Sequence, residues 1–138
     1  MATIIPDEGA YSVSQIFAQL DASMSIRLYK VANTNTATTV FADFTEADFD
    51  GYTAVTAPTP TYGYDTGNNR GYVDFGTQTW TCTGSSTPNT VYGVLLCCVD
   101  LVGGTPTYVI LASDFPAPYT MNTNGQTFDT HPKLYFAN

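Results

Sequence analysis

Residues 91–112 read VYGVLLCCVD, LVGGTP and TYVILA in succession, and this stretch decides the fold of the chain. Both outer segments are rich in β-branched, aromatic and aliphatic residues, as strands are. Between them, Gly103-Gly104-Thr105-Pro106 supplies the positive-φ and fixed-φ positions that a tight reversal needs. The stretch therefore predicts a β-hairpin.

The first arm of this hairpin is apolar on both sides, because successive side chains of a strand point to opposite faces. One face carries Leu95, Cys97 and Val99, and the other carries Val94, Leu96 and Cys98. A sheet with one wetted side alternates apolar and polar residues, so both sides of this ribbon are expected to be covered. Leaving about four such side chains in water would forfeit roughly 6–10 kcal/mol, comparable to the whole stability of a small domain.

The composition favours one all-β domain. A chain of 138 residues is long enough for one core and short for two. Charged residues make up 12% of it, against a usual value of about 25%, and Thr, Tyr, Gly and Pro take their place. Because Thr and Tyr suit strands and Gly and Pro suit turns, we expect an arm over residues 1–11 and a single β domain over residues 12–138.

The charge and the first residues argue against several classes of function. The formal net charge is −8, with Arg27, Lys30, Arg70 and Lys133 as the cations, so a nucleic-acid backbone is not an expected partner. The opening MATIIPDEGA does not resemble a secretion signal, and no apolar run approaches a membrane span. We expect a soluble protein made in the cytoplasm, without a membrane partner. Its three cysteines are expected to be free thiols.

Residues 12–20 predict one short helix. Ser12 followed by Gln15 resembles a capping box, and an apolar stripe recurs at helical spacing at Ile16, Phe17 and Leu20. A helix this short is marginal alone, so the stripe must dock on an apolar surface. That surface is either a face of the central hairpin or a neighbouring copy in an oligomer.

The next residues predict a strand, a loop and a turn. Met24–Val31 alternates as a half-buried strand does, and residues 33–39 form a polar loop. Thr45–Asp48 predicts one capped helical turn that Gly51 ends. A strand then follows over residues 52–57, until Pro58 and Pro60 stop it. The aromatic residues expected to pin the turn to the core are Phe41, Phe44, Phe49 and Tyr52.

Residues 58–71, PTPTYGYDTGNNRG, predict the longest loop and an outward-facing functional surface. Flat amphipathic rings beside short polar groups form the mixture that contacts sugars or proteins. The alternative is a tyrosine-rich loop packed on itself. The outward residues are Tyr62, Tyr64, Asp65, Asn68 and Arg70, with Asn69 and Tyr72 beside them.

The C-terminal half completes the expected β fold. Strands are predicted over residues 72–75 and 77–83, and pairing about a turn near Ser86 would place Cys82 opposite Val91. A proline-rich crossing at residues 114–118 precedes the Asn124-Gly125 hairpin signal and a final strand over residues 127–136. Eight or so strands and one short helix favour a two-sheet antiparallel sandwich, Ig-like or jelly-roll-like, with a closed barrel as the second architecture.

Few residues suggest chemistry. Glu46, Asp48 and Asp50 have the spacing of the front half of a calcium loop, but Ala57 stands where its bidentate glutamate belongs, so a capped turn is favoured. His131 has no nucleophile or carboxylate partner that the sequence singles out, and we expect it on a strand surface. We predict no catalytic residue, no cofactor site and no metal site.

Three segments resemble small virion structural proteins of tailed bacteriophages. In SIRLYKVANTNTATTVFADFTEADFDGYTAV, an (I/L)RLY strand at residues 26–29 precedes a Thr/Asn-rich loop and a D-F-T-E-A-x-F-x-G-Y turn at residues 43–52. FGTQTWTCTGSSTPNTVYGV, with a TVYG motif at residues 90–93, and ASDFPAPYTMNTNGQTFDTHPKL are similar to later parts of the same family. The resemblance covers most of residues 24–136 and lies at positions that determine a fold.

The resemblance implies a non-enzymatic virion protein, made in the host cytoplasm and assembled with other virion proteins. We expect a capsid decoration or cement subunit that contacts the major capsid or adjoining protein and forms a homo-oligomer. The expected alternative is a tail, adaptor or fibre-associated module that binds a host glycan or a protein. An enzyme is disfavoured by the scarcity of His, Lys and Arg. The expected assembly interface comprises Ile16, Phe17, Leu20, Leu96 and Cys98.

Overall fold

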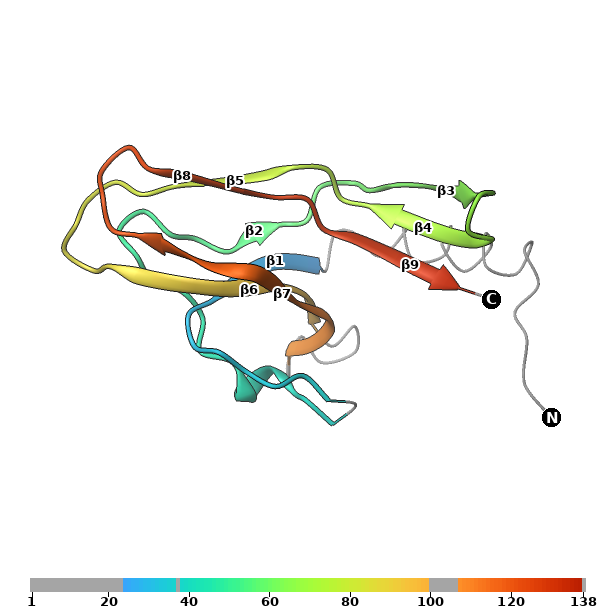
Figure 1. Cartoon of the computed structure of the whole chain (residues 1–138), viewed down its shortest axis with the longest axis horizontal. Helices are drawn as coiled ribbons and strands as arrows, with labels where there is room; N and C mark the ends of the chain where they lie inside the picture. The colour runs from blue at the N-terminus through green and yellow to red at the C-terminus, as the bar shows by residue number, and fades with distance from the viewer. Residues whose placement is uncertain (1–23, 37, 100–106, 138) are drawn as a thin grey trace. The chain divides into compact units, whose positions relative to one another are not determined.

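The computed structural model describes residues 24–36, 38–99 and 107–137, and this part of the chain is all-β (Figure 1). The predicted helix over residues 12–20, with Ile16, Phe17 and Leu20, lies outside the described residues, as do the arm and the tip of the central hairpin. The elements are β1 (Met24–Tyr29), a 3-10 helix η2 (Phe41–Asp43), β2 (Val55–Thr56), β3 (Thr61–Asp65), β4 (Arg70–Asp74), β5 (Gln78–Thr81), β6 (Asn89–Val99), β7 (Thr107–Met121), β8 (Thr127–Thr130) and β9 (Lys133–Ala137).

The strands form three sheets in which all the paired strands run antiparallel. One sheet has the order β2-β1-β6-β7, a second has the order β3-β4-β9, and β5 pairs with β8 in a third. The described residues fall into two compact units. One unit holds β3, β4 and β9, and the other holds the remaining strands. The single domain expected over residues 12–138 stays a prediction.

The central hairpin is confirmed as the pairing of β6 with β7, in which Cys98 lies opposite Tyr108. The four residues from Val94 to Cys97 are each at most 5% exposed, so both sides of this ribbon are covered within one chain. On one side, Leu95 and Cys97 form a cluster with Tyr29 of β1. The hydrophobic residues packed against that cluster are Phe41, Phe44, Tyr92, Val109 and Ala112.

Strand β1 alternates as its sequence predicts, although it ends at Tyr29 rather than at Val31. Its apolar side chains Met24, Ile26 and Leu28 are buried, while Ser25 and Arg27 are half-buried. It lies between β2 and β6. The backbone of a strand with neighbours on both edges is hydrogen-bonded on both sides. The position of β1 is therefore well defined, and the segment that follows packs against it.

The expected crossing at residues 114–118 is instead part of the edge strand β7. Val91 lies opposite Tyr119 and Gly93 lies opposite Asp114, so residues 115–118 bulge out of the register. A bulge on an edge strand tolerates Pro116 and Pro118, which have no N–H to donate. A Cβ at Gly93 would overlap the Tyr29 hydroxyl and the Ser113 carbonyl oxygen, which explains the glycine of the TVYG motif.

Two local predictions were wrong. Residues 45–48 form no helical turn; the 3-10 turn lies earlier, at Phe41–Asp43, and Glu46 makes an isolated β-bridge with Tyr29. The predicted long loop contains strand β3 and a tight turn, so residues 61–74 form a β-hairpin. Asn69, with φ 48°, takes the left-handed conformation in that turn, which Asn tolerates better than most residues.

The Asn124-Gly125 signal makes a turn, but it does not join two strands of one hairpin. Gly125 has φ 84°, as such a turn requires, yet β7 and β8 belong to different sheets. The backbone N–H of Cys82 donates to the Gln126 carbonyl oxygen (2.8 Å), and the Gly125 N–H donates to the Cys82 carbonyl oxygen (2.8 Å). Cys82 therefore lies against this turn and not opposite Val91. The expected final strand is divided into β8 and β9, with His131 and Pro132 between them.

Candidate functional site

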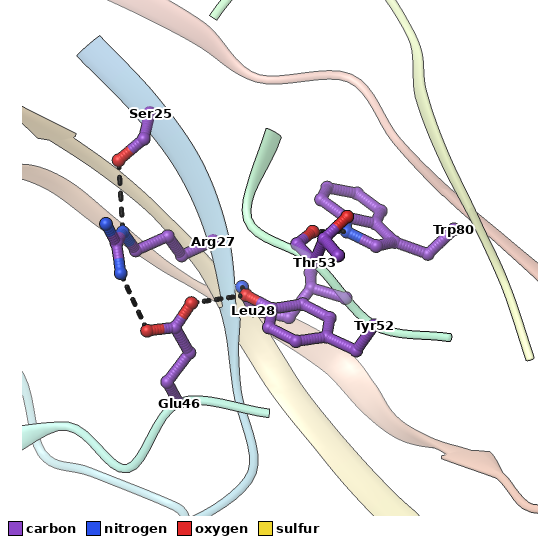
Figure 2. Close-up of polar contacts among 7 residues, drawn as sticks. All are labelled: Ser25, Arg27, Leu28, Glu46, Tyr52, Thr53 and Trp80. Atoms are coloured by element: carbon purple, nitrogen blue, oxygen red, sulfur yellow. Dashed lines mark hydrogen bonds and ion pairs between the residues drawn. The ribbon is translucent and has the colours of Figure 1, made fainter. Parts of the chain in front are cut away.

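The (I/L)RLY strand and the turn after it are held together by a polar network (Figure 2). Arg27 donates from Nη1 to Glu46 Oε2 (2.7 Å) and from Nε to Ser25 Oγ (3.0 Å). The Tyr52 hydroxyl donates to Glu46 Oε1 (2.9 Å) and accepts the Leu28 N–H (3.0 Å). The Glu46 carboxylate, the Tyr52 hydroxyl and the Leu28 N–H are thus all bonded within the same network. This arrangement fixes the turn on β1 and leaves Glu46 with both carboxylate oxygens engaged.

A second set of contacts ties the same turn to Lys30, the residue after β1, and to the start of β6. Lys30 Nζ lies 2.6 Å from Asp48 Oδ2, while Asn89 Nδ2 donates to Asp48 Oδ1 (2.9 Å) and the Asp48 N–H donates to Asn89 Oδ1 (2.7 Å). Asn89 is only 5% exposed, so its amide is paired where water does not reach it. The hydrogen bonds from Lys30 and Asn89 hold the pKa of Asp48 below its usual value.

The three carboxylates with calcium-loop spacing contact different partners. Glu46 faces Arg27 and Tyr52, Asp48 faces Lys30 and Asn89, and Asp50 Oδ2 accepts the Ser86 N–H (2.6 Å). Within the described part of the chain, no group of three His, Cys, Asp or Glu side chains is placed to hold a metal ion. These carboxylates act here as anchors for neighbouring segments.

The β3-β4-β9 sheet presents a different combination of groups on one of its faces. Its register places Gly63 of β3, Tyr72 of β4 and Tyr135 of β9 in one row across the sheet. The two rows next to it on the same face are polar. In one of them Asp65 lies opposite Arg70, and in the other Asp74 lies opposite Lys133. Directly opposed residues point to the same face. We call this set the cation–tyrosine face: Asp65, Arg70, Tyr72, Asp74, Lys133 and Tyr135.

Two cations of this face contact one exposed ring. Arg70 Cζ lies 3.6 Å from the centroid of the Tyr135 ring, and Lys133 Nζ lies 5.5 Å from the same centroid and 4.0 Å from that of Tyr72. Tyr135 is 41% exposed. A cation over an aromatic face is attracted by the ring quadrupole. A Cβ on Gly63 would come 2.6 Å from the Tyr72 hydroxyl oxygen, so the Tyr72 side chain lies across that glycine.

Two carboxylates hold the cations in place. Asp65 Oδ2 accepts from Asn68 Nδ2 (2.8 Å) and from Arg70 Nε (3.1 Å), and both bonds lower the pKa of Asp65. Burial alone would raise the pKa of Asp74, but hydrogen bonds and two basic neighbours outweigh it and keep that pKa low. Those hydrogen bonds come from the Gly76 N–H (2.8 Å) and from His131 (2.6 Å), while Lys133 Nζ lies 3.5 Å from Asp74 Oδ2.

The structure divides the predicted outward set between two faces of one hairpin. Successive side chains of β3 point to opposite faces, so Tyr62 and Tyr64 lie on the face opposite Asp65 and Arg70. Tyr62 is 44% exposed there. Asn68 lies in the connecting turn, where it contacts Asp65. Lys133 and Tyr135 also belong to this face but were not among the residues predicted from the sequence. Their alternate spacing in a strand was the available signal, but it does not reveal that β9 pairs with β4.

The predicted assembly residues within the described chain differ in burial. Leu96 is 1% exposed in the single chain, so it offers a partner no surface without a rearrangement, whereas Cys98 is half-buried. Cys82, Cys97 and Cys98 are free thiols, as expected. Burial raises the pKa of the Cys97 thiol to about 12, which makes it unreactive near neutral pH.

Comparisons with protein-family models, with curated proteins and with solved structures found no match for this chain. Among the residues that the structure describes, no helix is both long enough and apolar enough to span a bilayer.

Proposed function

We propose that this chain is a non-enzymatic structural subunit of a tailed-bacteriophage virion, and specifically a decoration or cement subunit of the capsid. The observation that carries the proposal is that the segments with phage resemblance interlock. Arg27 of the (I/L)RLY strand pairs with Glu46 of the turn, Asp48 of the turn pairs with Asn89 at the start of β6, and Gly93 of the TVYG motif lies against Tyr29. A resemblance spread along the sequence thus corresponds to one packing unit.

The same proposal includes the architecture of a two-sheet antiparallel sandwich, Ig-like or jelly-roll-like. Two contacts support it within the larger unit. The Phe128 ring of β8 lies 5.0 Å from Phe115 and 4.9 Å from Tyr119, both in β7. The Trp80 indole N–H of β5 donates to the Thr53 carbonyl oxygen (Figure 2), at 3.0 Å. Trp80 is only 3% exposed. Both strands of the β5-β8 ribbon therefore direct an aromatic side chain toward neighbouring segments of the larger unit, as facing layers do.

In the proposed role, the subunit buries surface across the seams between shell proteins and so stabilises the assembled capsid. We propose that residues 1–20 bind an adjacent subunit, which is either another copy of this chain or the major capsid protein. The apolar ribbon does not by itself demand such a partner, because Val94 to Cys97 are already buried within the chain. The interlocked segments, rather than the ribbon, support the virion role.

The proposal is tested on phage particles that encode this chain. Particles purified on a density gradient should contain the chain in many copies, measured by quantitative mass spectrometry against the major capsid protein. Particles that lack the gene should assemble but release DNA at a lower temperature, followed with a dye that binds the released DNA. Absence of the chain from gradient-purified particles would overturn the virion role, and a handful of copies per particle would replace the capsid role with a tail role.

A tail, adaptor or fibre-associated binding module is the second candidate function. The cation–tyrosine face favours it, because an exposed tyrosine flanked by two cations lies on a sheet face where a ligand could reach it. The copy number separates this candidate from a capsid role.

A further inference from the structure

We infer that the cation–tyrosine face binds an acidic sugar, with the sugar carboxylate held by Arg70 and Lys133 beside the exposed Tyr135 ring. The inference does not depend on where in a virion the chain is located, since it rests on the geometry of this face alone.

The distribution of charge favours an anion at this face over the rest of the described surface. The described part of the smaller unit carries Arg70 and Lys133 against two carboxylates, Asp65 and Asp74. The described part of the larger unit carries two cations, Arg27 and Lys30, against six carboxylates, which are Asp43, Glu46, Asp48, Asp50, Asp114 and Asp129. The chain as a whole has a net charge of −8. Among its described residues, cations and carboxylates are equal in number in the unit that holds this face, so an anion is repelled less there than at the larger unit.

Arg70 is held in a conformation suited to a carboxylate. Its guanidinium lies over the Tyr135 ring, with Cζ 3.6 Å from the centroid, and its Nε donates to Asp65 Oδ2 (3.1 Å). Among the described residues, Nε is the nitrogen through which Arg70 donates, so the two terminal nitrogens keep the fork that pairs with a carboxylate. Stacking and the Asp65 bond together reduce the conformational entropy that binding would otherwise cost.

Lys133 adds a second cation near the same ring, with Nζ 5.5 Å from the Tyr135 centroid. Its Asp74 partner is 3.5 Å away and is shared with His131 and the Gly76 N–H. A loose, shared ion pair leaves the ammonium able to turn toward a ligand at little cost.

The other groups of the face suit a saccharide better than a simple anion. A sugar ring has both apolar C–H groups and hydroxyl groups, and tyrosine offers a flat apolar surface with a polar tip. Tyr135 is 41% exposed, and the Asp65 side chain, which contacts Arg70, also accepts a hydrogen bond from Asn68. Carboxylate, ring and hydroxyl groups of one sugar would each have a partner of matching chemistry.

The test uses the full-length, isotopically labelled chain and two sugars that differ mainly at one carbon. Galacturonic acid carries a carboxylate where galactose carries a hydroxymethyl group. Titrations followed by amide chemical shifts should give saturable binding of galacturonic acid at millimolar concentration, with shifts centred on β4 and β9. Galactose should bind at least about tenfold more weakly, because it lacks the charge-assisted hydrogen bonds.

Matched variants locate the binding. Arg70→Gln should weaken galacturonic acid binding by about tenfold, and Arg70→Lys, which keeps the charge but loses the fork, should weaken it by less. Lys30→Gln removes a cation of similar exposure from the larger unit and should leave binding unchanged. Tyr135→Leu should weaken binding, whereas Tyr108→Leu, at a 51% exposed tyrosine of β7, should not.

Several results would overturn the inference. Equal binding of galactose would remove the role of the carboxylate. Binding of inorganic phosphate or N-acetylglutamate as tight as that of galacturonic acid would replace the sugar with a simple anion or an acidic peptide. An equal loss in Lys30→Gln, or no saturable shift in the wild-type chain up to tens of millimolar sugar, would remove the site. Amide spectra of each variant, compared with wild type, separate loss of folding from loss of binding.

Discussion

The four cations of this chain have nearly equal exposure but different surroundings. The side chains of Arg27 and Lys30 are 24% and 27% exposed, and those of Arg70 and Lys133 are 31% and 30% exposed. Arg27 and Lys30 each pair with a carboxylate of the following turn that is further bonded to Tyr52 or Asn89. Arg70 and Lys133 pair with Asp65 and Asp74 of their own sheet, and both also lie against tyrosine rings of one sheet face. The exposed fraction of a cation therefore does not indicate its role. Its role is indicated by the segments that it connects.

The largest expected difference between the two regions is in stability. Arg27→Ala should lower the free energy of unfolding by about 1–3 kcal/mol, since it leaves half-buried Glu46 without its cation. Arg70→Ala, whose Asp65 partner is only five residues away, should lower it by less than about 1 kcal/mol. Urea denaturation followed by tryptophan fluorescence measures both. Equal losses would mean that Arg70 is as structural as Arg27.

A smaller difference in stability is expected when a tyrosine hydroxyl is removed from each region. Tyr52→Phe removes a hydroxyl that donates to Glu46 and accepts the Leu28 N–H, and it should lower the free energy of unfolding by about 1–2 kcal/mol. Tyr135→Phe keeps the ring beneath Arg70 and should change stability by less than about 0.5 kcal/mol.

Burial and nearby Glu46 raise the pKa of Tyr52. In an alkaline titration its phenol should therefore remain protonated at a pH where a tyrosine of ordinary pKa would ionise.

The smallest expected difference concerns acid titration. Lys30→Met should raise the pKa of Asp48 toward its ordinary value, because the hydrogen bond from Lys30 is the main cause of its depression. Lys133→Met should raise the pKa of Asp74 less, because Gly76 and His131 also lower it. Carboxyl carbon chemical shifts during a pH titration report both values.

These depressed pKa values also have a definite effect on stability. A carboxyl whose folded pKa lies below its unfolded pKa stabilises the fold above the unfolded value, and this contribution is lost as pH falls through the folded pKa. Stability of the wild-type chain should therefore fall on acidification, and Lys30→Met should show a smaller fall. An acid transition of unchanged size in Lys30→Met would show that the Asp48 contact does not contribute.

Strong hydrophobic patterns predicted the centre of the fold. The apolar run from Val94 to Cys97 gave the hairpin and its burial on both sides, and the alternation of Met24, Ile26 and Leu28 gave β1. These patterns are reliable because burial of several large side chains outweighs local preferences.

Segments held by long-range pairing were predicted less well. Strand β3 has two prolines just before it and little apolar side chain of its own, and its conformation depends on pairing with β4 and on Tyr72 lying across Gly63. The Asn124-Gly125 turn was predicted from local preference. The pairing of β8 with β5 depends on contacts between segments far apart in the sequence, which local preference does not reveal. Tyr135 joined the candidate site for the same reason, through the pairing of β9 with β4.

Image reconstruction of the intact particle by electron cryomicroscopy tests the proposed function most directly. The proposed capsid role predicts a repeated outer-surface density that lies across the seams between capsid proteins and into which the β2-β1-β6-β7 sheet and its long β6-β7 hairpin fit. A capsid surface without that density, in particles shown by mass spectrometry to contain all their other structural proteins, would contradict it.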